Sequence, residues 1–153
     1  MSEIDRILTH YDQVMQGSAW HGDPVWQVLE GIDAEAAAAR PLPDAHTIWE
    51  IVMHMIFWEG VVNERLAGRR AGLIEEKNFP PMPQATEENW RKTLDQLRAS
   101  NRAFRDALAK LDPVKIGELS AAGKRTYYDE AHGIIEHHIY HLGQIVLLSK
   151  AAR

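Results

Sequence analysis

The stretch HGIIEHHIYHLGQIVLL, residues 132–148, decides the fold. Its apolar residues recur every three or four positions, which is the spacing of one face of an α-helix. Asp129 and Glu130 stand near the expected start, where acidic side chains stabilise a helix, and Lys150 stands near the expected end. We therefore predict a helix from about Tyr128 to Ala151 with a broad apolar face.

Three further segments show the same spacing. Thr47 and Glu50 form a capping-box pattern at the start of one, and a proline-rich stretch, residues 79–83, precedes another. The predicted bounds of these helices are Ser2–Gln16, Thr47–Leu66 and Thr86–Leu111. Four amphipathic helices of this length are typical of a helical bundle.

The connection between the first two helices, residues 17–46, is long. It can contain short helices near residues 24–29 and 34–39, and it can cross one end of a bundle. No pair of segments has the alternation and tight turn of a β-hairpin. We predict an all-α fold, a four-helix bundle with a long connection between helices 1 and 2, forming a single domain over residues 1–153.

Composition excludes several classes of function. Hydrophobic residues make up 45% and charged residues 25% of the 153 positions, as in an ordinary globular protein. The formal net charge of −5 and the absence of a long basic run argue against nucleic acid as a partner. No stretch approaches the roughly 20 apolar residues of a membrane span. Cysteine is absent, so thiolate ligands and cysteine nucleophiles are excluded, and a cytoplasmic location is expected.

Eight histidines are the unusual feature of the composition. His137 and His141 are four residues apart, so both project from one face of the last helix, the face that carries Ile145. His54 lies on the apolar side of the second helix. Three imidazoles on inward faces can bind one divalent ion and leave a coordination position open, which is the pattern of a catalytic site.

One other interpretation of these histidines stays open, and a fourth histidine of the same region is assigned elsewhere. Buried histidines can simply be satisfied by hydrogen bonds within the core. His138 lies about 100° from His137 around the helix, so we assign it to the flank of the bundle or to an interface and not to the metal.

Two motifs resemble the DinB-like superfamily. The stretch HTIWEIVMHMIFWE, residues 46–59, is similar to the family's second helix, with His54 ahead of the aromatic-acidic pair Trp58-Glu59. The stretch 132–148 is similar to the family's fourth helix, where two histidines four apart precede a Gly-Gln step, as His137 and His141 do here. The resemblance implies a four-helix bundle with a three-histidine metal site, formed by His54, His137 and His141.

The resemblance also implies a chemistry. Some DinB-like proteins are described as metal-dependent hydrolases, and others transfer low-molecular-weight thiols. We therefore expect a divalent metal, zinc or nickel first, that activates water or a small thiol toward a small-molecule substrate. The protein is expected to be a homodimer. The alternative is a non-catalytic metal-binding protein with a stress-response or interaction role. No catalytic base is assigned.

Two further residues have more than one interpretation. Glu50 precedes His54 by one helical turn and can orient its imidazole, but its place in the capping box is a sufficient explanation. His21, in the aromatic stretch 20–26, can line the mouth of a pocket or lie in a surface loop.

Overall fold

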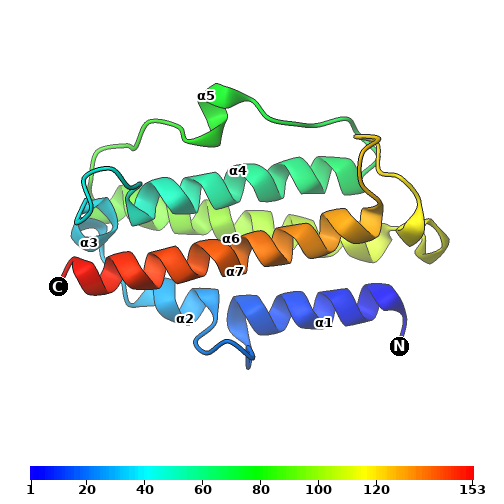
Figure 1. Cartoon of the computed structure of the whole chain (residues 1–153), viewed down its shortest axis with the longest axis horizontal. Coiled ribbons are helices and arrows are strands. Elements are labelled where there is room, and N and C mark those ends of the chain that lie inside the picture. The colour runs from blue at the N-terminus through cyan, green and yellow to red at the C-terminus, as the bar shows by residue number, and fades with distance from the viewer.

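The computed structural model describes all residues from 1 to 153, and the chain is all-helical (Figure 1). Four helices are long: α1 (Glu3–Gln16), α4 (Ile48–Leu66), α6 (Glu87–Lys110) and α7 (Tyr127–Ala151). The short elements are α2 (Val25–Glu30), α3 (Ala34–Ala38), α5 (Glu75–Asn78) and a 3₁₀ helix, η1 (Pro113–Gly117). The predicted helical fold class is confirmed. None of the helices has the length and apolar character needed to cross a bilayer.

The helix starts follow from their caps. The Ser2 and Thr47 side chains each accept a hydrogen bond from a backbone N–H three residues on, and each closes a capping box. Thr86 caps α6 in the same way, so all three predicted N-caps are confirmed. The last helix begins at Tyr127, one residue earlier than predicted, because Thr126 and Asp129 form a capping box of their own.

One core lies between the long helices. In α4 the buried positions recur as Ile48, Val52, Met55, Glu59, Val62 and Leu66, a spacing of three and four residues. Trp49 is fully buried, and its indole N–H donates to the Thr93 hydroxyl of α6 at 2.9 Å. Burial of each large apolar side chain stabilises the fold by about 1.5–3 kcal/mol. The hydrogen bond removes the penalty for burying the indole N–H.

The connection between α4 and α6 is long because these two helices run in the same direction. In Figure 1, α4 and α6 run the same way, whereas α1 and α7 run the opposite way. Residues 67–86, which we call the strap, therefore return along the outside of α4 before α6 begins. The strap follows Leu66, where α4 ends. Gly68 adopts φ +81°, a conformation that glycine tolerates without strain.

Candidate metal centre

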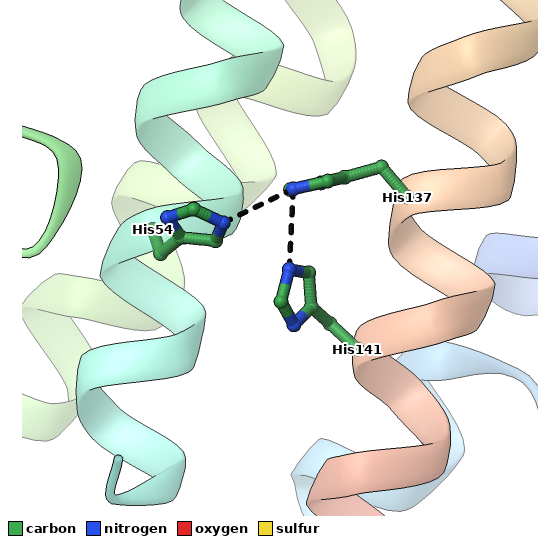
Figure 2. A group of neighbouring side chains, drawn as sticks. All are labelled: His54, His137 and His141. Carbon is green, nitrogen blue, oxygen red and sulfur yellow. Dashed lines mark hydrogen bonds between the residues drawn. The ribbon is translucent and has the colours of Figure 1, made fainter. Parts of the chain in front are cut away.

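The structure brings His54, His137 and His141 together (Figure 2). His54 projects from α4, and the other two project from successive turns of α7. The Nε2 atom of His137 lies 3.1 Å from the Nε2 atom of His54 and 3.1 Å from that of His141. One ring nitrogen from each residue lies within 4.8 Å of the others, so the three can hold a single metal ion.

Hydrogen bonds on the far side of two rings fix which nitrogen faces the centre. His54 Nδ1 donates to the backbone carbonyl of Asn78 at 3.0 Å, and His141 Nδ1 donates to the Gln144 side-chain oxygen at 2.6 Å. Because a carbonyl oxygen only accepts, each Nδ1 carries the proton and each Nε2 presents a lone pair.

The lone pairs converge on His137. A neutral imidazole has one N–H, so His137 can donate to only one of its two neighbours at a time. Its Nδ1 atom is buried without a hydrogen-bond partner. Three imidazoles whose Nε2 atoms meet at one place, two with their tautomer set from behind, form a donor set that fits a divalent ion.

The surroundings keep these rings neutral. Burial lowers the pKa of His137 to about 3, with further lowering from His141, His138 and His54. Burial also lowers the pKa of His54 and of His141 below the ordinary value. Only neutral imidazole donates a lone pair to a metal, so the ligand form is the one that this environment favours at neutral pH.

Zinc binding should therefore persist to lower pH than an ordinary histidine site allows. Because the pKa values of all three histidines are lowered, protons compete with the ion at a lower pH than at an ordinary histidine site, where the pKa is about 6.5. We expect zinc affinity, measured by chelator competition, to change little between about pH 7.5 and 6 and to fall below that. A loss of half of the zinc binding at about pH 6.5 would show that the histidines titrate at the ordinary value and would contradict the lowered pKa values.

The free energy of unfolding of the metal-free protein should also decrease as the pH falls. The unfolded chain binds protons on these histidines at a pH where the folded chain does not. The free energy of unfolding should thus be at its full value above about 6.5 and decrease as the pH falls toward the folded value of about 3. Urea unfolding across this range provides the measurement.

A cavity of about 590 Å³ adjoins the triad, and His54 and His141 form part of its wall. Most of the remaining wall is apolar: Leu42, Ala45, Ile51, Phe79, Tyr140, Leu147 and Leu148. The volume is within the range of small-molecule sites, roughly 300–1,000 Å³. The side of the triad formed by His54 and His141 is therefore accessible to a small molecule.

The prediction for His138 was wrong. This residue is fully buried, and its Nε2 atom lies 3.1 Å from Glu59 Oε1. The rotation of about 100° from His137 turns it toward the interior between α1 and α4, not toward the flank. Glu59 is also fully buried and accepts hydrogen bonds from Tyr11 Oη at 2.5 Å and from Asn101 Nδ2 at 2.9 Å.

Each of the four long helices thus supplies one residue to a buried polar layer: Tyr11, Glu59, Asn101 and His138. Burial alone would raise the pKa of Glu59, but the neighbouring His138 and hydrogen bonds from His138 and Tyr11 bring it below the ordinary value. Burial and the Glu59 charge raise the pKa of Tyr11 well above its ordinary value. Glu59 is therefore a buried carboxylate held by neighbouring donors.

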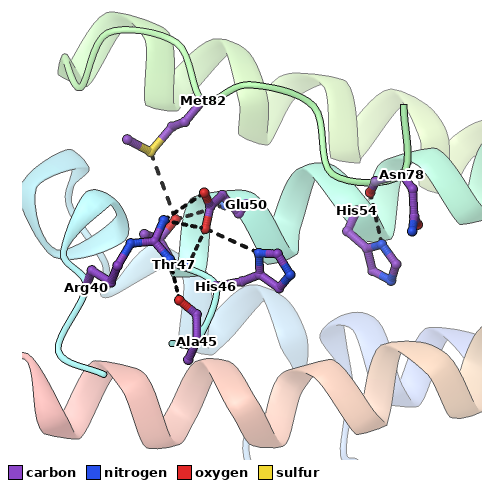
Figure 3. Close-up of polar contacts among 8 residues, drawn as sticks. All are labelled: Arg40, Ala45, His46, Thr47, Glu50, His54, Asn78 and Met82. Carbon is purple, nitrogen blue, oxygen red and sulfur yellow. Dashed lines mark hydrogen bonds and ion pairs between the residues drawn. The ribbon is translucent and has the colours of Figure 1, made fainter. Parts of the chain in front are cut away.

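Glu50 acts through its helix cap and not through His54 (Figure 3). Its carboxylate accepts from the Thr47 backbone N–H at 2.7 Å and binds Arg40 at 2.8 Å, and it lies 3.5 Å from His46 Nδ1. The capping interpretation is therefore confirmed. His21 is exposed and does not line the cavity beside the triad, which agrees with a surface-loop position.

The sequence reasoning missed the residues that surround the triad. Asn78 and Phe79 contact His54 from the strap, and His46 lines the cavity. No periodic pattern marks residues 78–79. Glu59 could have been found, because a carboxylate occupies a core position of the α4 repeat between Met55 and Val62.

Removal of the ion should leave the helices intact. The core forms one cluster of 29 buried residues and does not depend on the triad. We expect the circular dichroism of the protein to be unchanged by chelation. The melting temperature should rise by roughly 5–10 °C on saturation with zinc, because a ligand present at about 100 times its Kd stabilises the native state by about 2.7 kcal/mol. Unfolding on chelation would instead make the site structural.

Comparison with known proteins supports one family assignment. No curated protein and no solved structure matches this sequence significantly. The family model of the DinB superfamily matches residues 19–145, a range that includes His54, His137, His141 and the strap. The match covers far more than half of the chain, so the resemblance carried by the two histidine motifs is confirmed. The chain belongs to the DinB superfamily.

Proposed function

We propose that this protein is a metal-dependent enzyme with a four-helix-bundle fold. It holds one divalent ion on His54, His137 and His141 and uses this ion in catalysis. The observation that carries the proposal is the contact between the triad and the cavity. The Nε2 atoms converge, and two of the three rings also line a space of about 590 Å³. A ligand set that opens on a pocket favours an enzyme over a non-catalytic metal-binding protein, whose site would be closed.

A bound divalent ion can lower the pKa of a water molecule to about 7 and can deprotonate a thiol. The residues of this chain orient the imidazoles and shape the cavity. Asn78 and Gln144 fix the tautomers of His54 and His141, and the apolar wall excludes water from a bound molecule. The Tyr140 side chain also lines the cavity and can provide a hydroxyl to a substrate.

The family resemblance implies two reactions that are compatible with this arrangement: hydrolysis and transfer of a low-molecular-weight thiol. The chain has no cysteine, so an attacking thiol must come from a cosubstrate. Zinc and nickel are the first candidates for the ion, because three neutral imidazoles suit several first-row metals and availability in the cell selects among them.

The test is an assay of the zinc- and nickel-loaded protein with two panels. One combines small thiols with an activated aryl halide, and the other offers esters and amides without thiol. Thiol-dependent turnover that is lost in His141→Ala supports the transferase, and thiol-independent turnover with the same loss supports the hydrolase. Turnover that survives both chelation and His141→Ala would contradict a metal-dependent reaction.

A homodimer is part of the proposal. Tyr140, Gly143 and Leu147 are exposed and follow one another at helical spacing on α7. A side chain at Gly143 would meet nothing within 4 Å in this chain, so a partner helix can approach there. Sedimentation velocity distinguishes a dimer from a monomer.

A further inference from the structure

The strap, residues 67–86, contacts the rest of the protein near its start through Arg69 and Ala71, near its end through Met82, and between them beside His54. None of its residues is buried, and α5 within it has no buried side chain. Asn78, the last residue of α5, and the next two residues, Phe79 and Pro80, are half-buried. A segment with few buried contacts has low local stability. The contacts of residues 78–80 therefore hold the middle of the strap in place.

Asn78 makes two hydrogen bonds there. Its backbone carbonyl accepts from His54 Nδ1 at 3.0 Å (Figure 3), and its side-chain oxygen accepts from Trp58 Nε1 at 2.9 Å. His54 and Trp58 lie one turn apart on α4, so the side chain fixes the position of the carbonyl that the imidazole needs.

Phe79 fixes the plane of the same imidazole. Its ring stacks on His54 with centroids 4.2 Å apart and an interplanar angle of 7°. The opposite face of Phe79 stacks on His46 at 3.7 Å and 4°. His46 lies 3.5 Å from Glu50, so the stack ends on a side chain that is itself held. Phe79 also lines the cavity beside the triad, where its position affects access.

The other two histidines do not depend on the strap. His141 is oriented by Gln144 of its own helix, and both His137 and His141 are carried by α7. The candidate site therefore consists of a pair held by one helix and a third ligand whose orientation is set from a loosely packed segment.

We propose that Asn78 and Phe79 are positioning residues that hold His54 in its ligand orientation, so that strap docking and metal binding stabilise each other. The inference rests on the proposed metal site. If docking of the strap favours the ion, the ion must favour docking by the same factor, since the two equilibria are linked. The strap then regulates both the completeness of the site and access to its cavity.

The first experiment measures metal affinity. Zinc competition with a chromophoric chelator should show that Asn78→Ala and Phe79→Leu each weaken binding by about 10- to 100-fold, the usual effect of losing an outer-shell partner. Asn78→Asp keeps an oxygen acceptor for Trp58 and should restore the affinity. The Co²⁺ absorption spectrum should change in Asn78→Ala and return in Asn78→Asp, which a loss of general stability would not produce.

The second experiment measures hydrogen exchange. The Lys77 and Asn78 amides donate to the Ile74 carbonyl within the strap. Zinc should slow their exchange in the wild-type protein and should slow it less in Phe79→Leu. Glu76→Ala is the matched control, because this exposed strap residue makes no contact with His54.

The outcomes separate the two proposals. Failure of the wild-type protein to bind either zinc or nickel would overturn the proposed function. Zinc binding by the wild type with unchanged affinity and Co²⁺ spectrum in Asn78→Ala and Phe79→Leu would overturn the strap inference alone. Strap exchange that does not respond to zinc would also overturn it.

Discussion

Replacement of His137 by alanine is expected to abolish stoichiometric zinc binding. His137 is the central member of the triad, since its Nε2 atom lies 3.1 Å from each of the other two. Its loss leaves two imidazoles on different helices. The expected loss of affinity exceeds the roughly 10- to 100-fold that an outer-shell partner contributes. His54→Ala and His141→Ala should have similar effects in elemental analysis of protein dialysed against zinc.

His10→Ala is the control for this series, because His10 is exposed on α1 and lies outside the triad. His138→Ala is a less suitable control, although His138 lies next to His137 in the sequence and outside the triad. The substitution removes a hydrogen-bond partner of the buried Glu59 and can destabilise the core. Full zinc content in His137→Ala would show that the triad is not the ligand set. Loss of zinc in His10→Ala would point to a different site.

Replacement of Glu59 by alanine should have the largest effect on stability. Three groups from other helices, Tyr11 Oη, His138 Nε2 and Asn101 Nδ2, contact this carboxylate in the core. Its loss leaves buried donors without an acceptor at about 1–3 kcal/mol each, so the total of about 3–5 kcal/mol is a large share of the roughly 5–15 kcal/mol that holds a domain together. The melting temperature should fall by roughly 6–20 °C for a chain of this size.

Calorimetry of Glu59→Ala beside Glu64→Ala provides the test. Glu64 is on the same helix, but it is exposed and pairs with Arg69 at the surface, so its loss should change the melting temperature little. Glu59→Gln keeps the side-chain volume, so its melting temperature should lie between those of Glu59→Ala and Glu64→Ala. Equal melting temperatures for Glu59→Ala and the wild type would mean that the polar layer does not stabilise the core.

The helices and their starts were predictable because the signals are local. The Thr47–Glu50 capping box and the apolar spacing of α7 depend on residues within a few positions of one another. His137 and His141 share a face by helix geometry alone. Whether His54 meets these two residues depends on how α4 packs against α7. The sequence signals for that meeting were the position of His54 on the apolar side of its helix and the family resemblance.

The polar layer was missed for a different reason. Glu59 was not predicted to be a core residue, although it continues the repeat of buried positions through Met55 and Val62. Its partner Tyr11 is 48 positions away, a pairing that no local pattern encodes. The contacts of Asn78 and Phe79 with His54 arise from a segment without helical periodicity, so only the folded strap reveals them.

A crystal structure with anomalous scattering data, from protein purified without a nickel column, tests the central claim most directly. We predict one anomalous peak for a divalent ion in contact with Nε2 of His54, His137 and His141, with a coordination position facing the cavity that His54 and His141 line. A peak elsewhere would contradict the metal site. A fourth position filled by a protein side chain, with no adjoining cavity, would contradict the enzyme.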